Sequence, residues 1–138
     1  MKIIVVSLLV VFAIIIVSSS KDNIAYFEIK DDSNLMFRFF IKLEDQELIN
    51  HARRILSGKE TNRTHIMGKI YKEKVKYNPN YPFHIVPDSI SFFQFADDHC
   101  DVTTTFITHN YDDECGGSLP GCIWCPWQSQ LVQEVKIK

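Results

Sequence analysis

The chain has 138 residues and contains 15 Lys and Arg against 17 Asp and Glu, a formal net charge of −2. This length suits one domain with a buried core. The slight acidity offers no basic face of the kind that nucleic-acid binding requires, so we expect no nucleic-acid partner.

The first twenty residues differ in kind from the rest. A single positive charge at Lys2 precedes an almost uninterrupted apolar run, and three serines end it. A charged start, an apolar stretch of roughly 7–15 residues and a small-residue cleavage site define a secretory signal peptide. A membrane anchor needs about 20 apolar residues, and this run is shorter and lacks a basic stop-transfer cluster. We predict that 1–20 is a signal peptide cleaved near Ser20, and that 21–138 is a single secreted domain with no membrane attachment after cleavage.

The predicted domain opens with a β-hairpin. Residues 25–30 and 37–43 each alternate between apolar and polar side chains, as half-buried strands do. Residues 31–34 between them are Asp-Asp-Ser-Asn, which favours a turn. We therefore expect the two strands to pair antiparallel.

Residues 45–57 are predicted to form a helix that lies across the apolar face of this hairpin. Asp45 can cap the first turn, and Gly58 can adopt the left-handed conformation that ends a helix. Four apolar side chains recur at the spacing of one helix face: Leu48, Ala52, Ile55 and Leu56.

The middle of the chain returns to strand patterns. Residues 65–75 alternate as a strand, and a shorter strand is expected at 83–86, after a proline-broken loop at 77–82. For 96–109 we prefer a helix, although its β-branched run at 102–105 disfavours one. The inner face of that helix would hold Ala96, Cys100, Thr103, Phe106 and Ile107.

The last third contains a Gly- and Pro-rich segment, 115–127, with both tryptophans and three of the four cysteines. We predict that this segment is a disulfide-stapled loop and that 130–137 is a final strand. The predicted fold is α+β: a small antiparallel sheet, made of the hairpin and further strands, packed by two helices, with the stapled Gly/Pro/Trp loop near the C-terminus.

The four cysteines are an even set: Cys100, Cys115, Cys122 and Cys125. In an exported domain such a set indicates two disulfides, with three pairings open. We favour Cys100–Cys125, which ties the predicted helix to the tryptophan segment, and Cys115–Cys122, which closes a small loop. A zinc site is the alternative, because Cys122-x-x-Cys125 has ligand spacing. Export disfavours zinc, so we predict no metal and no cofactor.

Asn62-Arg63-Thr64 is a glycosylation acceptor sequence in a polar stretch. Together with the signal peptide, it predicts a glycan on Asn62 that stands on an exposed loop.

Aromatic side chains gather in two loops, one around Tyr77 and one around Trp124. Tyr and Trp are favoured where one edge of the ring packs and the other contacts a partner. The alternative is a purely structural role, in which Trp124 packs over a disulfide and Trp127 closes the core. The predicted ligand-binding residues are Tyr77, Tyr81, His84, Trp124 and Trp127. We therefore expect a secreted, non-catalytic module that binds an extracellular protein or ligand.

The sequence holds no complete catalytic motif, so the enzyme hypothesis is secondary. It would be a small secreted hydrolase that uses His84 with a carboxylate, either Asp88 or Asp101. The bland interpretation of His84 is a partly buried strand residue whose ring is satisfied by a neighbour.

From His65 onward the chain resembles a known family. The matching blocks are Ile66-Met67-Gly68-Lys69-Ile70, Tyr77-Asn78-Pro79, Phe83-His84, Pro87-x-Ser89-Ile90-x-Phe92-Phe93, Cys100-Asp101, Gly116-Gly117-x-Leu119-Pro120-Gly121 and Trp124-Cys125-Pro126-Trp127-x-Ser129-x-Leu131-Val132-x-Glu134-Val135. They resemble the N-terminal domain of a family of calmodulin-binding proteins and their bacterial relatives. Cys115 and Cys122 stand where relatives usually lack cysteine, which supports pairing these two with each other.

The resemblance implies calmodulin binding and supplies no catalytic residues. A calmodulin target is a basic amphipathic helix with bulky anchors. The nearest candidate is 48–56, with His51, Arg53 and Arg54 on its polar side. Its apolar face is needed for the core, and an exported protein does not meet cytosolic calmodulin. Calmodulin binding is therefore an alternative function.

Overall fold

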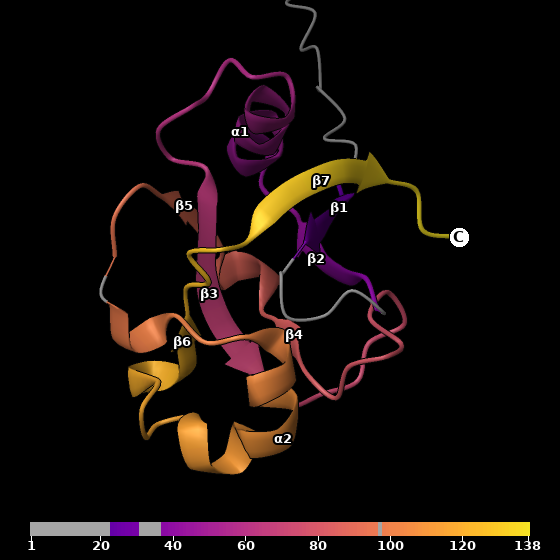
Figure 1. The fold of residues 1–138 in the computed structure, drawn as a ribbon. Coiled ribbons are helices and arrows are strands. Elements are labelled where there is room, and N and C mark those ends of the chain that lie inside the picture. Colours follow the sequence, from indigo (N-terminus) through magenta and orange to yellow (C-terminus); the bar gives the residue numbers. More distant parts are fainter. Residues whose placement is uncertain (1–22, 31–36, 97) are drawn as a thin grey trace, which may run out of the picture.

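The computed structural model describes residues 23–30, 37–96 and 98–138, so the predicted signal peptide and the predicted turn at 31–34 lie outside the described residues. The elements follow the order β1 (Ala25–Lys30), β2 (Phe39–Leu43), α1 (Gln46–Leu56), β3 (His65–Tyr71), β4 (His84–Ile85), β5 (Ser91–Phe93), α2 (Thr104–Glu114), β6 (Ile123–Trp124) and β7 (Gln130–Val135). Short 3₁₀ turns lie at Pro87–Ser89, Asp98–Cys100 and Pro120–Cys122. The predicted α+β class is confirmed (Figure 1).

The predicted hairpin belongs to a three-stranded sheet with the order β2-β1-β7. Both neighbours run antiparallel to β1, and Phe27 lies opposite Ile41 of β2. Alternate side chains of β1 and β2 are buried on one face, as the period-2 pattern predicts. The last strand was also expected, but β7 ends at Val135 and is shorter than predicted.

A second sheet is built around β3, which pairs antiparallel with β4, β5 and β6 along its length. The predicted alternation is confirmed, because Ile66, Gly68 and Ile70 are buried. Gly68 must lack a side chain, since a Cβ there would lie 2.4 Å from Ile85 Cγ2. The strand ends at Tyr71, not at Val75 as expected.

Helix α1 begins and ends where its caps predict. The Asp45 carboxylate accepts a hydrogen bond from Leu48 N at 2.9 Å, and Gly58 has a φ of +77°. Its deepest apolar side chains are Ile49 and Ala52, while the predicted Leu48, Ile55 and Leu56 are partly buried. The buried face also includes His51, whose ring stacks on Phe92 with centroids 4.6 Å apart. Figure 1 shows α1 lying over β7, and Arg53 donates two hydrogen bonds to Glu134 of that strand.

The helix predicted at 96–109 is wrong in its position. Residues 98–100 form only a 3₁₀ turn, and α2 starts at Thr104 and runs to Glu114. Thr103 caps it by accepting from Phe106 N, so this β-branched residue starts the helix and does not lie inside it. Of the predicted inner face, Ile107 is buried, whereas Phe106 is 42% exposed.

Both disulfides are present with the favoured pairing, Cys100–Cys125 and Cys115–Cys122, and their Cα atoms are 5.1 and 4.4 Å apart. Cys100 and Cys125 are buried, and Cys125 N also donates to Cys100 O at 2.9 Å. The stapled segment is more regular than expected, because Ile123 and Trp124 form β6 against β3.

Trp124 lies at the centre of the core. It is 0% exposed, and its ring contacts Phe39 and Phe83 at centroid distances of 5.6 and 6.0 Å. Its indole Nε1 donates to Val102 O at 2.7 Å. Because Phe39 belongs to β2 and Trp124 to β6, this ring joins the two sheets.

Candidate binding site

The structure distributes the five predicted ligand-binding residues among different environments. Trp124 and Tyr81 are core side chains, exposed by 0% and 2%. His84 is also buried, with Nδ1 3.0 Å from the backbone oxygen of Glu73. Tyr77 and Trp127 are half-buried and lie in separate aromatic contacts. The surface-exposed part of the predicted set is therefore Tyr77 and Trp127.

The loop that carries Tyr77 is fastened to the free edge of β2. Asn78 is fully buried, and its side chain forms two hydrogen bonds with one backbone unit: Phe40 N donates to Oδ1 at 2.7 Å, and Nδ2 donates to Phe40 O at 2.6 Å. Tyr81 OH donates to Phe37 O at 2.9 Å. The side chains of Asn78 and Tyr81 thus bond to backbone groups at the edge of the sheet. These backbone groups would otherwise lack a partner strand. Sequence reasoning missed Asn78, although it lies in the Tyr77-Asn78-Pro79 block.

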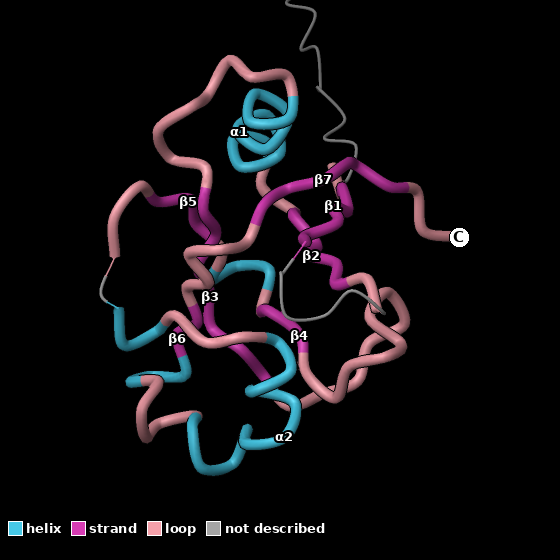
Figure 2. Tube along the Cα trace, in the orientation of Figure 1, coloured by secondary structure: helices cyan, strands magenta, loops and turns pink. Residues whose placement is uncertain are grey.

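With the loop held there, Tyr77 forms one wall of a hollow of about 420 Å³. The strand register places Phe40 and Val135 on the outer face of the three-stranded sheet, because Glu28 lies opposite Phe40 and Tyr26 opposite Val135. The described residues that line it are Arg38, Phe40, Lys76, Tyr77, Pro79, Val135, Lys136, Ile137 and Lys138, and we call this hollow the lysine groove. Three segments that are far apart in the sequence therefore build the groove. In Figure 2 the C-terminus and the loop between β3 and β4 lie on the same side of the molecule.

The described lining of the groove holds four cationic side chains and no carboxylate side chain, although the chain as a whole is slightly acidic. Lys76, Lys136 and Lys138 form no ion pair with any residue in the described ranges. Arg38 differs, because it pairs with Glu28 and lies over the Phe40 ring, 5.1 Å from its centroid. The hydrogen bond from Arg38 lowers the pKa of Glu28, against the opposing effect of partial burial.

Tyr77 is neutral at physiological pH. Burial, together with the smaller effects of nearby Tyr26, Glu44 and Glu73, disfavours a phenolate and raises the pKa of Tyr77 to about 12. Its ring lies 5.3 Å from that of Tyr26, while its hydroxyl makes no hydrogen bond to a described residue. The phenol can therefore offer an apolar ring and a free hydroxyl to a ligand.

Trp127 belongs to a second aromatic surface. Its ring lies 5.4 Å from Phe93 and 6.2 Å from Phe95, and Phe95 is 77% exposed. The backbone N of Trp127 donates to Asp101 Oδ1 at 2.9 Å. This surface is aromatic, but it lacks the free cations of the lysine groove.

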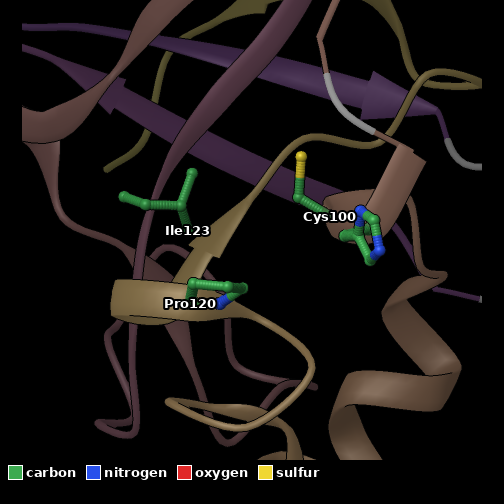
Figure 3. A pocket seen from close by; sticks show the side chains of 4 residues that line it. Cys100, Pro120 and Ile123 are labelled. Atoms are coloured by element: carbon green, nitrogen blue, oxygen red, sulfur yellow. The ribbon is translucent and has the colours of Figure 1, made fainter.

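A second hollow, also of about 420 Å³, is lined by His99, Cys100, Pro120 and Ile123 among the described residues. In Figure 3 the side chains of Cys100 and Ile123 lie on opposite sides of strand β6, with Pro120 below them. Its walls are mostly apolar and it offers few groups that could select one ligand over another.

The arrangement that the hydrolase hypothesis requires is not formed in the part of the chain that the structure describes. His84 makes no hydrogen bond to Asp88 or Asp101: its Nδ1 lies 3.0 Å from Glu73 O, and Asp101 Oδ1 accepts from Trp127 N. No cluster of three His, Cys, Asp or Glu side chains suited to a metal ion occurs among the described residues. No helix in these ranges is long and apolar enough to cross a bilayer.

The fold and site define a small disulfide-bonded α+β domain with a surface groove lined by lysines and aromatic rings. The chain belongs to the family described as the BP-74 N-terminal domain, whose pattern matches residues 23–138. This confirms the resemblance seen in the sequence. No curated protein and no solved structure matches the chain.

Proposed function

We propose that this chain is a secreted, non-catalytic binding domain and that its partner binds in the lysine groove. The observation that carries the proposal is the set of three lysines, without ion pairs to any described residue, around the hollow that Tyr77 and Phe40 line. Free like charges gathered at one site repel one another, and an anionic partner relieves that repulsion. The two disulfides are compatible with an extracellular compartment.

The groove is favoured over the other two surfaces because it combines shape, charge and a free hydrogen-bonding group. The surface around Trp127 and the hollow beside Cys100 are mainly apolar. Binding sites generally combine apolar walls with a few polar groups that set orientation. Of the three surfaces, the lysine groove best fits that description.

The test uses the oxidised, secreted protein as bait for extracellular proteins, with two charge-matched variants. Lys76→Glu/Lys136→Glu reverses two groove cations, while Lys59→Glu/Lys69→Glu makes the same change in net charge at exposed lysines outside the groove. We expect a partner that wild type and the second variant retain and the first loses. A partner retained equally by both variants would place the binding surface elsewhere, and no retained partner would contradict the binding role.

Secretion and glycosylation form a separate part of the proposal. Asn62 is exposed, and the Glu60 carboxylate accepts hydrogen bonds from Asn62 N and Arg63 N, which orders the loop. Expression in a eukaryotic secretory system should yield a chain that begins near Lys21 and carries a glycan removable from Asn62. Intact mass spectrometry checks both, and an unprocessed N-terminus in the product would contradict secretion.

Calmodulin binding, which the family resemblance implies, has less support from the geometry. Helix α1 buries Ile49 and Ala52 in the core, and its Arg53 is paired with Glu134. A calmodulin target must release such a face for the groove of calmodulin. We expect no calcium-dependent retention of the oxidised domain on immobilised calmodulin, and clear retention would reverse this preference.

A further inference from the structure

We infer that the occupant of the lysine groove is an extended acidic peptide segment that alternates carboxylates with apolar side chains. The inference rests on the proposed function, because it names the partner chemistry of the same groove. Its acidic side chains would approach Lys76, Lys136 and Lys138, and its apolar side chains would contact Tyr77 and Phe40.

The apolar half of the inference comes from the floor of the groove. Phe40 and Val135 face outward from the sheet, and Tyr77, Pro79 and Ile137 add further apolar surface. The Arg38 guanidinium stacks on Phe40 and is paired with Glu28. Arg38 therefore widens the flat surface around Phe40, while its charge is already balanced by Glu28. Such a floor favours a ligand with apolar side chains, because contact with them removes apolar surface from water.

The acidic half comes from the rim. The three rim lysines are exposed and free of ion pairs to described residues, whereas Arg38 at the same groove is neutralised. Their ammonium groups are mobile point charges, which bind carboxylates without the fixed bidentate geometry of arginine. Charge complementarity of this kind selects an anionic partner and accelerates its association.

We infer the extended conformation of the occupant from the end of the chain that forms one side of the groove. Beyond β7, Lys136 and Lys138 are exposed, while Ile137 between them is half-buried. In an extended peptide, residues two apart are separated by roughly 6.5–7 Å and lie on the same side. Carboxylates at every second position therefore lie on one side of the peptide, where the flexible Lys136 and Lys138 side chains can reach them, and the apolar residues lie on the other.

These observations favour a peptide over a polyanionic glycan. A sulfated glycan carries dense charge and few apolar groups, so it would leave the Tyr77 and Phe40 surface uncovered. A peptide that alternates acidic and apolar residues can use both the rim and the floor.

The test measures binding of three fluorescent hexapeptides to the oxidised, secreted protein. One alternates glutamate with leucine and phenylalanine, and the others replace every glutamate with glutamine or with lysine. We expect the glutamate peptide to bind, the glutamine peptide to bind roughly 10-fold more weakly, and the lysine peptide to bind weakest. This ratio corresponds to about three exposed ion pairs of ordinary strength. Amide NMR shifts should concentrate at Phe40, Tyr77 and Lys136.

A neutralised variant separates charge from shape. Lys76→Gln/Lys136→Gln/Lys138→Gln should weaken the glutamate peptide by roughly 10-fold and leave the glutamine peptide unchanged. Lys59→Gln/Lys69→Gln is the control and should alter neither. Equal binding of glutamate and glutamine peptides, or shifts confined to another surface, would overturn the inference.

Three outcomes separate the inference from the proposed function. If a heparin oligosaccharide binds in the groove and the glutamate peptide does not, the partner is anionic but of another class. If charge reversal at Lys76 and Lys136 abolishes retention of the natural partner while no peptide binds, the groove is the site and only the peptide inference fails. If that reversal leaves retention of the natural partner unchanged, the proposed function fails first.

Discussion

The segment around Trp124 and the lysine groove are both rich in aromatic rings, but the fold uses these rings differently. Trp124 is enclosed between two sheets, donates its indole proton to Val102 and is adjacent in sequence to a buried disulfide. Tyr77 lies on the outer face of one sheet and is half-buried, and its hydroxyl and the lysines beside it have no polar partner in the described part of the chain. An aromatic loop therefore becomes a binding candidate only where polar and charged groups remain without internal partners. The first region should control stability, and the second should control binding.

The largest effect should come from Trp124→Ala. Removing a fully buried aromatic ring typically costs about 3–5 kcal/mol, and here it also leaves Val102 O without its donor. Trp127→Ala is the matched control and should cost less, because that ring is only half-buried. Urea unfolding of the two variants checks the difference. Equal losses would show that Trp124 is not the residue that joins the sheets.

The two disulfides should also differ. Replacing Cys100 and Cys125 with serine removes a bridge between residues 25 apart, whereas Cys115–Cys122 spans only 7. We expect about 2–4 kcal/mol for the first pair and less for the second, because a longer loop loses more unfolded-state entropy on closure. Thermal unfolding of the two double variants measures the order, and a larger loss at Cys115–Cys122 would contradict it.

Asn78→Ala should connect the two regions. It removes two hydrogen bonds to the Phe40 backbone, which is worth about 1–3 kcal/mol at a buried position. It should also release the loop that carries Tyr77 and weaken binding in the groove. Hydrogen exchange at Phe40 N and peptide affinity report the two effects. Unchanged exchange at Phe40 would show that the loop is held by other contacts.

High pH should lower the stability of the fold by ionising Tyr77 in the groove. Tyr77 has a pKa of about 12 in the folded protein against an ordinary 10. Because the folded state binds this proton more tightly, its contribution to stability is complete below pH 10 and is lost as pH rises toward 12. Ultraviolet titration should show that Tyr77→Phe has lost a late-ionising tyrosine of the wild type, while Tyr111, whose pKa is also raised by burial, remains in both. Glu28 has the opposite pH dependence, because its pKa is lowered in the folded protein. Its contribution to stability is present at pH values above the ordinary glutamate pKa and is lost as the pH falls through the lowered pKa.

The smallest effect on stability should follow Lys76→Glu/Lys136→Glu. These exposed side chains have no described ion-pair partner, so the free energy of unfolding should change by less than about 0.5 kcal/mol. The same variant should lose its partner. A clear loss of stability would mean that the lysines support the fold, which would remove the contrast with Trp124.

Local patterns in the sequence determined much of the fold. Alternation predicted β1, β2 and the start of β3, and the caps at Asp45 and Gly58 predicted α1, because these signals act within a few residues. The even cysteine set indicated two disulfides. The start of α2 was missed because the cap at Thr103 competes with a helical pattern that begins earlier.

Only the tertiary structure decided which aromatic residues face solvent. Trp124 and Tyr77 both lie in proline-containing segments that were predicted to be loops, and their burial depends on strands paired far along the chain. The lysine groove is the clearest case, since Lys76 and Lys136 meet only after the loop docks through Asn78 and β7 pairs with β1. The sequence by itself determined the local elements and the cysteine framework, because those depend on neighbouring residues. It could not show the groove, because that depends on contacts between residues about 60 positions apart, which no local pattern encodes.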